Sequence, residues 1–456
     1  MFKIGAADAV VRPNAGRYHT LIAAVQRRAV RDAGVYAPVA TGGSTATRPP
    51  ERPLVQKEFL KAGHLPTLLA AFLYFDLSFM TWVLLGPLGV SIAAELHLNA
   101  AQKGLMVAFP VLAGAGLRVV LGLLVDRYGP RRVGIGAQLM VILSLLFAWG
   151  VGIRSYAGTL VLGVVLGVAG ASFAVALPLA SAWYPPEHQG TALGLAGAGN
   201  SGTVLAALFA PGLAVAFGWQ NVVGLAAIPL AATLMVYCLL AKDSPRVALR
   251  ISLADYLRLL RIADAWWFMF FYAITFGGFV GLSSSLTMYF NDRYHLSAVS
   301  ASYCTAAIVF VGSLMRPIGG AVADRVGGAR TLTMLYMLAS ASFATIASGL
   351  SSIGFAMPVF VLGMLALGMG NGAVFQLVPQ RFSRQMGIAT GLVGMSGGVG
   401  GFYLSSSLGY SKQVSGSYAP GFLVFALLAA AALVCIGGIA RRWRTTWAQA
   451  YGAARV

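Results

Sequence analysis

The strongest constraint on the fold is a series of apolar stretches, each long enough to cross a membrane as a helix. A hydrocarbon core of about 30 Å requires about 20 apolar helical residues. Twelve stretches in the chain meet this length: 66–92, 101–125, 132–152, 158–182, 190–217, 221–241, 265–290, 298–322, 330–350, 353–379, 387–410 and 419–440. With 58% hydrophobic residues and a mean hydropathy of +0.78, the sequence predicts an all-α polytopic membrane protein with twelve transmembrane helices.

The basic residues lie mostly on one side of these stretches. The net charge of +19 alone would also suit a nucleic-acid-binding protein, but 26 of the 32 Lys and Arg residues lie in the N-terminal segment, the C-terminal tail and alternate loops. Only Lys103, Arg154, Arg293 and Lys412 lie in loops on the other side. This asymmetry predicts a multi-pass protein of the inner membrane with both termini in the cytoplasm. It argues against a nucleic-acid partner.

The polar segments divide the chain. We expect a cytoplasmic and partly disordered extension over 1–65, six-helix bundles over 66–241 and 265–441, a cytoplasmic linker over 242–264 and a tail over 442–456. The extension has no apolar core of signal-peptide length. Within it, residues 17–31 either form a basic amphipathic helix on anionic lipid or belong to a loosely ordered tail.

An internal duplication relates the two bundles. Residues 116–132 and 314–330 share the same design at an offset of 198, which places Arg118 on Arg316. Residues 190–197 match 387–394 at an offset of 197. Two parallel six-helix repeats are typical of a transporter with its substrate site near mid-membrane, where the repeats meet.

Each repeat holds one arginine inside an apolar run, eight residues before a polar Asp-Arg pair. At a rise of about 1.5 Å per residue, Arg118 and Arg316 lie about 12 Å inside the ends of their helices. A buried charge needs a partner or an aqueous cavity, and Asp76 is the only acidic residue expected at mid-membrane depth. The surplus positive charge therefore predicts an anion site, and forked guanidinium groups suit a flat oxyanion.

Glycine-rich runs and aromatic residues surround these arginines in the predicted bundle. The runs contain Gly199, Asn200, Ser396 and Gly397. They either pack helices closely or also let a small ion approach the backbone, with Asn200 as a side-chain donor. Phe173, Tyr272, Phe276 and Phe375 are candidates to surround a weakly hydrated anion with their ring edges, although each ring singly is more often a core residue. Tyr272 and Phe276 are one turn apart and share a helix face.

The repeated acid-base pairs have a different expected role. Asp126, Arg127, Asp324 and Arg325 lie at the cytoplasmic ends of helices, so we expect a conformational gate that pins helices in one state and releases them in the other. No nucleophile and base pair, metal cluster or nucleotide loop stands out, so neither an enzyme nor a cofactor or metal is expected. Cys238, Cys304 and Cys435 lie in or beside apolar runs and suit packing.

The pattern Gly-x-x-x-Asp-Arg-x-Gly-x-Arg-Arg at 122–132 resembles the loop motif of the major facilitator superfamily. With the glycine runs at 196–202 and 391–402 and Gly-Met-Gly-Asn-Gly-Ala-Val-Phe-Gln at 368–376, the chain resembles the nitrate/nitrite porter (NarK-type) family over residues 66–440. The resemblance implies that Arg118 and Arg316 clamp the anion, with Asn200, Phe173, Tyr272 and Phe276 around it. The resemblance also implies Asn371 as a candidate anion-binding residue.

The expected function is secondary transport of nitrate and nitrite by a monomer in lipid. A membrane potential negative inside opposes anion uptake by about 2.3 kcal/mol per charge per 100 mV. Uptake therefore needs cotransported protons or exchange for nitrite. We favour nitrate/proton symport with Asp76 as the proton site, and nitrate/nitrite antiport is the alternative; Asp76 is merely structural if it stays ionised beside an arginine. A carrier for another small anion, such as a carboxylate, and a nitrate sensor on a transporter scaffold remain as alternatives.

Overall fold

The computed structural model describes Phe59 and residues 62–244, 252–382 and 385–451. The described residues form helices joined by short turns, and no strand occurs among them. In the first half the helices are α3 (Leu65–Trp82), α4 (Leu85–Glu95), α5 (Ala100–Tyr128), α6 (Pro130–Val151), α7 (Tyr156–Gly170), α8 (Phe173–Ser181), α9 (Pro186–Gly197), η1 (Ala198–Ser201), α10 (Gly202–Phe217), α11 (Trp219–Leu225) and α12 (Ala227–Leu240). After α13 (Leu253–Leu259) come α14 (Ala263–Tyr294), α15 (Ala298–Val326), α16 (Gly328–Ala347), α17 (Ile353–Phe382), α18 (Met386–Ser415) and α19 (Ala419–Tyr451).

These helices account for twelve membrane spans within the described part of the chain. Ten segments are long and apolar enough by composition, and four of them are broken: α3 with α4, α7 with α8, α9 with η1 and α10, and α11 with α12. The other two spans are α16, of 20 residues, and α18, of 30 residues. Both also have the length to cross, and α18 is rich in glycine and serine because it packs between α5 and α14.

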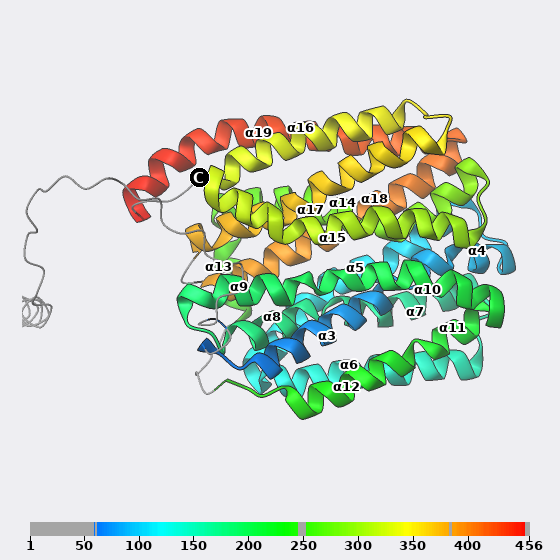
Figure 1. Ribbon diagram of the computed structural model, residues 1–456, viewed down its shortest axis with the longest axis horizontal. Coiled ribbons are helices and arrows are strands. Elements are labelled where there is room, and N and C mark those ends of the chain that lie inside the picture. The colour runs from blue at the N-terminus through cyan, green and yellow to red at the C-terminus, as the bar shows by residue number, and fades with distance from the viewer. Residues whose placement is uncertain (1–58, 60–61, 245–251, 383–384, 452–456) are drawn as a thin grey trace, which may run out of the picture. The chain divides into compact units, whose positions relative to one another are not determined.

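The two halves lie side by side (Figure 1). Their contact is made by α5 against α18, α10 against α15, and α4 against α14. Small residues permit the approach: a Cβ on Gly398 would lie 2.6 Å from the Ala115 Cβ, and one on Gly104 would lie 2.8 Å from the Gly409 Cα. The repeated Gly129 and Gly327 turn the chain between helices with φ of 86° and 102°, a conformation that side chains with a Cβ rarely adopt.

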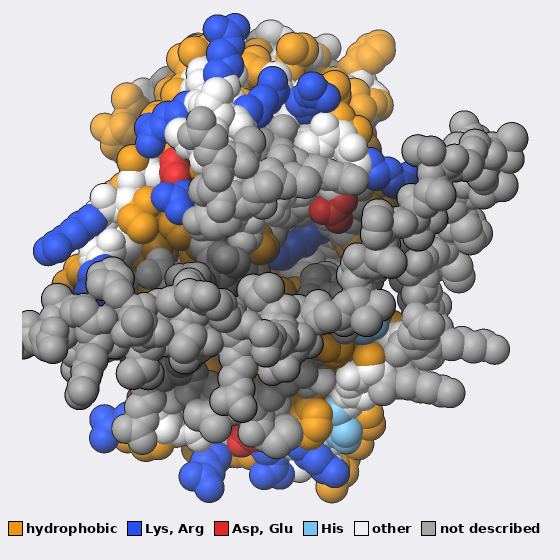
Figure 2. Space-filling view, turned by 90° about the vertical axis from the view of Figure 1, so that its left-hand side faces the viewer, with side chains coloured by type: hydrophobic (Ala, Val, Ile, Leu, Met, Phe, Trp, Pro, Cys, Tyr) orange, Lys and Arg blue, Asp and Glu red, His pale blue; other side chains and the backbone are white. Residues whose placement is uncertain are grey.

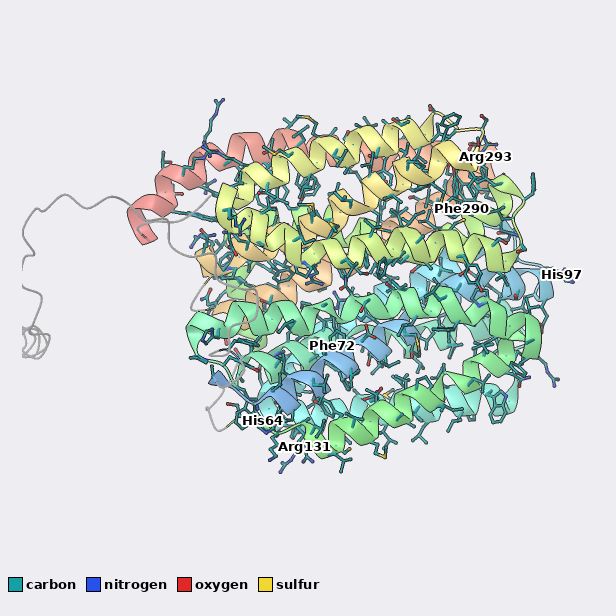
Figure 3. All side chains as sticks on the ribbon, viewed as in Figure 1. His64, Phe72, His97, Arg131, Phe290 and Arg293 are labelled. Carbon is teal, nitrogen blue, oxygen red and sulfur yellow. The ribbon has the colours of Figure 1, made fainter. Side chains whose placement is uncertain are left out.

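The bundle has two chemically different ends (Figure 3). One carries α13, His64 and Arg131, and we call it the linker end; the other carries His97, Arg293 and Lys103, and we call it the Lys103 end. Figure 2 shows Lys and Arg side chains around the rim of the linker end. Exposed basic residues at that end include Arg127, Arg132, Arg258, Arg261, Arg325, Arg330, Arg441, Arg442 and Arg444.

The last helix extends beyond its expected end at residue 440. It continues to Tyr451 because Trp443 is fully buried against Phe268, with ring centroids 5.0 Å apart. Trp443 Nε1 donates a hydrogen bond to Asp264 Oδ1 at 2.9 Å, and Arg381 Nε lies 2.6 Å from Asp264 Oδ2. Part of the expected tail is therefore helical and tied to α14 and α17.

Two glycines of α10 provide a test of this packing. A Cβ at Gly202 would lie 1.7 Å from the backbone oxygen of Asp76, whereas nothing lies within 4 Å of a Cβ at Gly212. We expect Gly202→Ala to lower the thermal melting temperature of the purified protein, with a cost of about 1–3 kcal/mol or more from overpacking. Gly212→Ala is the matched control and should melt at or above the wild-type temperature because alanine favours the helix. Equal melting of the two variants would contradict the helix contact.

Candidate functional site

The two intramembrane arginines are buried and belong to opposite halves. Arg118 lies on α5 and is 1% exposed, while Arg316 lies on α15 and is 9% exposed. They lie against one aromatic cluster: the Arg118 Cζ is 5.4 Å from the centroid of Phe173, the Arg316 Cζ is 5.7 Å from that of Phe375, and these two rings are 6.0 Å apart. Within the described part of the chain, neither arginine forms an ion pair with a carboxylate. The structure thus brings together two uncompensated cations, which are costly in a membrane interior.

Arg118 is held by backbone oxygens from both halves. Its Nε donates to the Gly170 oxygen at 3.2 Å, and its Nη1 donates to the Gly394 oxygen. Three aromatic rings surround its Cζ, with centroids at 5.3 Å for Trp82, 5.4 Å for Phe173 and 5.2 Å for Phe276. These contacts stabilise the cation. Its Nη2 is buried and has no hydrogen-bond partner among the described residues, which leaves the N–H groups of this nitrogen for a ligand.

Arg316 has fewer partners. Its Cζ lies 5.7 Å from the centroid of Phe375, and its charge interacts with the hydroxyl of Tyr272. Its Nη1 is buried without a hydrogen-bond partner. Because a buried guanidinium nitrogen without a partner carries a desolvation cost, this side chain is also set up to bind a further acceptor.

Each arginine faces a glycine of the opposite half. A Cβ on Gly197 would lie 3.7 Å from the Arg316 Cζ, and one on Gly394 would lie 3.6 Å from the Arg118 Nη1. Gly197 and Gly394 are equivalent in the duplication, at the offset of 197. The two halves therefore make the same crossed contact twice, and the sequence analysis did not include either glycine among the binding residues.

One aromatic cluster connects the two cations. Tyr272 and Phe276 stack with centroids 5.0 Å apart at 5°. Phe375 packs edge-on against Tyr272 at 4.9 Å and lies 6.0 Å from Phe173. The predicted rings Phe173, Tyr272 and Phe276 thus do come together around the arginines. Phe375 belongs to the same cluster, and Trp82, which the sequence analysis did not include, completes it.

Two buried amides add polar groups to the interior. Asn200 in η1 and Asn371 in α17 are fully buried, and neither the amide nitrogen nor the amide oxygen of either has a partner. Such groups are uncommon in protein interiors. The 3-10 turn η1 interrupts the helical fifth span at Asn200, and such interruptions are frequent at functional positions.

The remaining predicted binding residues make packing contacts. The Ser396 hydroxyl hydrogen-bonds to the backbone oxygens of Met269 at 2.8 Å and Val393 at 2.7 Å. A Cβ on Gly199 would lie 2.6 Å from the ring of Phe75, so this glycine fits against α3. A Cβ on Gly397 would meet the stacked rings of Tyr272 and Phe276 at 2.7 and 2.8 Å, so Gly397 makes room for them.

Asp76 lies on α3 and is 7% exposed. Its Oδ1 accepts a hydrogen bond from the Ser201 hydroxyl at 2.7 Å. The sequence analysis left open whether an arginine would neutralise this carboxylate, and no ion pair to it occurs among the described residues. Ser201, its partner, is a residue that the sequence analysis placed in a glycine run without assigning this contact.

The repeated acid-base pairs lie at the linker end. Asp126 is half-buried, Arg127 and Arg325 are exposed, and Asp324 is exposed as well. The Arg127 Cζ lies 5.3 Å from the Tyr128 ring. In the described ranges, neither Arg127 nor Arg325 forms an ion pair, and the conformational gate stays a prediction.

Between the halves at the linker end lies Tyr256 of α13. A Cβ on Gly122 or on Gly391 would lie 3.1 or 3.2 Å from its hydroxyl. Burial, followed by the nearby Asp126 charge, raises the pKa of Tyr256 to about 12. The neutral phenol thus lies between α5 and α18, on the linker-end side of the two arginines.

The central arrangement can bind an anion. Among the described residues, it supplies N–H groups without a partner on two guanidinium groups and on two buried amides, together with aromatic rings around the arginines. A small planar anion can accept from both cations at once, and its negative charge offsets their repulsion.

Comparison with known proteins adds four findings. A sequence model of the Major Facilitator Superfamily matches residues 68–405. A probable nitrate/nitrite transporter NarK2 of Mycobacterium tuberculosis is 36% identical, covering 78% of this chain and 91% of its own. A nitrite extrusion protein of Bacillus subtilis is 32% identical, covering 78% and 90%. Among solved structures, a bacterial homologue of the lysosomal transporter Spinster, inward-facing and unoccupied, has a TM-score of 0.60 at 16% identity, covering 88% of this chain and 99% of that one. That likeness shows the fold alone.

Arg118 has more contacts than Arg316, so we expect substitutions of the two arginines to change the stability of the protein differently. We expect Arg316→Met to raise the melting temperature of the protein in anion-free buffer, because it removes a buried cation and the repulsion with Arg118. Replacing buried charges by apolar residues of similar volume often stabilises by about 1–4 kcal/mol. Arg118→Met gives up two hydrogen bonds to backbone oxygens, so its gain should be smaller or negative. Differential scanning fluorimetry measures both, and a large loss in Arg316→Met would contradict an uncompensated charge.

Proposed function

Because this chain belongs to the nitrate/nitrite porter (NarK-type) family of the major facilitator superfamily, we propose that it carries nitrate and nitrite across the cytoplasmic membrane by alternating access. The two six-helix halves, 66–241 and 265–441, rock about a site between Arg118 and Arg316. Residues 242–264 link the halves on the cytoplasmic side, where both termini lie, and a monomer suffices because one chain supplies both arginines. The extension over 1–65 lies almost wholly outside the described residues.

The observation that carries this proposal is the pair of buried guanidinium groups, each with an unpaired N–H. Nitrate and nitrite are flat, singly charged and weakly hydrated, so they lose little on leaving water and can accept hydrogen bonds in one plane. Without an anion the two cations repel each other across the interface between the halves. Binding removes this repulsion and favours the state in which the halves close around the anion.

The aromatic cluster and the two buried amides add further contacts to the proposed site. Phe173, Tyr272 and Phe276 direct ring edges and a hydroxyl toward the anion, and Asn200 and Asn371 donate amide N–H groups. The quadrupole of an aromatic ring is positive at its edge, so the cluster excludes water without repelling the anion. Ser396, Gly199 and Gly397 contribute by shaping the walls of the site rather than by direct contact.

For coupling we favour nitrate/proton symport through Asp76. Its carboxyl group is buried, lacks a basic partner among the described residues and is hydrogen-bonded to Ser201, so uptake or loss of a proton changes its charge in a low-dielectric setting. Protonation would allow an anion and a proton to cross together against the membrane potential. The Bacillus subtilis relative, named a nitrite extrusion protein, favours nitrate/nitrite exchange as the second mechanism.

The clamp is tested by Arg118→Lys and Arg316→Lys in proteoliposomes. Lysine keeps the charge but loses the planar fork, so we expect each variant to lower nitrate counterflow at least tenfold, as hydrogen bonds to charged groups contribute about 1.5–3 kcal/mol each. Arg444→Lys, at an exposed position of α19, is the control and should transport normally. Wild-type counterflow in the two site variants, with all proteins monodisperse, would rule out the clamp. Binding without any counterflow in the wild type would favour a sensor.

The coupling is tested by recording external pH during nitrate uptake. Symport predicts alkalinisation outside that accompanies uptake and that disappears in Asp76→Asn, which cannot take up a proton. Ser201→Ala removes the hydrogen-bond partner but keeps the carboxyl group, so it should retain the pH signal. Nitrate uptake that requires internal nitrite and moves no protons would instead establish exchange.

A further inference from the structure

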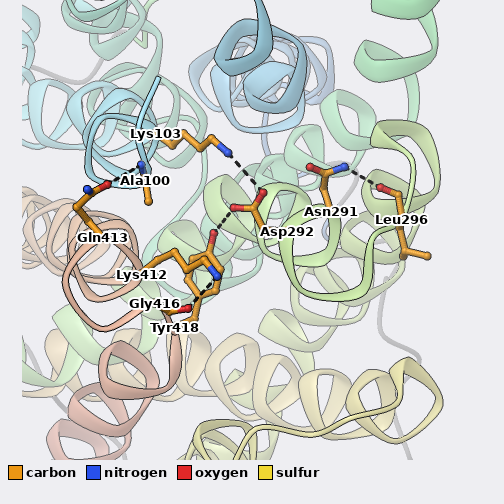
Figure 4. A network of polar contacts seen from close by, with 9 residues as sticks. All are labelled: Ala100, Lys103, Asn291, Asp292, Leu296, Lys412, Gln413, Gly416 and Tyr418. Atoms are coloured by element: carbon orange, nitrogen blue, oxygen red, sulfur yellow. Dashed lines mark hydrogen bonds and ion pairs between the residues drawn. The ribbon is translucent and has the colours of Figure 1, made fainter. Parts of the chain in front are cut away.

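A polar network joins the two halves at the Lys103 end (Figure 4). Lys103 Nζ on α5 lies 3.4 Å from Asp292 Oδ1 on α14. Asp292 Oδ2 accepts a hydrogen bond from the Tyr418 hydroxyl at 2.7 Å. Beside them, the Ala100 N–H donates to Gln413 Oε1 at 3.1 Å. The start of α5 is thus connected to α14 and α18 of the other half.

Comparison of the two repeats distinguishes the contacts that lie within one half from the contact that joins the halves. At the offset of 198, which also relates His97 to His295, Asp292 corresponds to Ala94. The neighbouring Glu95 accepts a hydrogen bond through Oε2 from Trp219 Nε1 at 2.6 Å. Each half therefore uses a carboxylate at the end of its first span to bind an aromatic donor of the same half. The residue equivalent to Lys103 is Ala301, at the offset of 198. The lysine contact between halves has no counterpart.

The position of Lys103 is unfavourable without its partner. It lies in the first turns of α5, where the helix dipole is positive and disfavours a cation. The side chains of Lys103 and Asp292 are 25% and 19% exposed, so the pair is of the modest strength typical of partly hydrated ion pairs. A cavity of about 240 Å³, lined by residues of both halves including His97, Lys103, Asn291 and Asp292, admits water to it.

We propose that Lys103 and Asp292 form a latch that holds the Lys103 end closed and that separates each time the protein opens there. Asp292 stays with Tyr418 on its own half, while Lys103 leaves with α5 and becomes hydrated. A pair of modest strength suits this role, because a much stronger one would trap the carrier in one state. The inference rests on the alternating access of the proposed function and is independent of which anion is carried.

The test uses a buried reporter beneath the latch. Ser285 lies on α14 two helical turns from Asp292, and it is 6% exposed. In a background with Cys238, Cys304 and Cys435 replaced by serine, Ser285→Cys is labelled in intact cells with a membrane-impermeant maleimide. We expect Lys103→Gln to speed labelling about two- to fivefold, and Lys103→Glu or Asp292→Lys to speed it more. Combining Lys103→Glu with Asp292→Lys should return labelling toward the slow rate of the parent.

Two controls make the outcome specific. Glu95→Gln weakens a contact that lies at the same end but within one half, and it should leave reporter labelling unchanged. Arg154→Cys, exposed in a loop at this end, reports that the reagent reaches this side. Parental labelling rates in Lys103→Gln and Lys103→Glu, or no restoration by the charge swap, would overturn the latch. Because labelling needs no anion, a latch that responds as expected alongside absent nitrate counterflow would refute the proposed substrate but not the latch.

Discussion

Two positive charges buried against each other across the interface between the halves shape the rest of this protein. Arg118 and Arg316 come from equivalent helices, and in the transport mechanism that we propose an anion between them offsets their repulsion when the interior closes. The protein compensates part of the cost with backbone oxygens and aromatic rings around Arg118. In the proposed mechanism, the bound anion offsets the rest of the cost of burying these two cations. Stability and transport are therefore opposed at this site, as is common where function requires uncompensated groups.

Glycine has two distinct uses in the interface. Away from the arginines, Gly104 and Gly409 bring α5 and α18 into backbone contact near the Lys103 end. At the centre, Gly197 and Gly394 leave room for a guanidinium group from the opposite half. The crossed contacts mean that neither half holds its arginine alone. A change in the distance between the halves therefore changes the environment of both cations together, which couples occupancy of the site to the conformation of the bundle.

The duplication is symmetric at the centre and asymmetric at the ends. The ion pair between Lys103 and Asp292 has no equivalent, because Ala301 stands at the related position. At the opposite end, Tyr256 of the linker helix α13 lies between α5 and α18, and a linker occurs only once in a two-repeat chain. The geometry that is repeated in both halves thus forms the proposed site. The ion pair and the linker helix, which each occur once, distinguish its two sides. Alternating access requires such a distinction, since each side must open separately.

The sequence by itself determined the helical membrane fold, the duplication and the burial of two arginines, because apolar length, repeat offset and helix rise are properties of a linear pattern. It also placed Tyr272 and Phe276 on one face, since helical period relates residues four apart. Only the tertiary structure decided that Gly394 faces Arg118, that Trp82 joins the rings, that Ser201 binds Asp76, and that α19 continues to Tyr451. These contacts join different helices. They depend on the rotation and crossing of each helix against its neighbours, which no pattern along a single segment specifies.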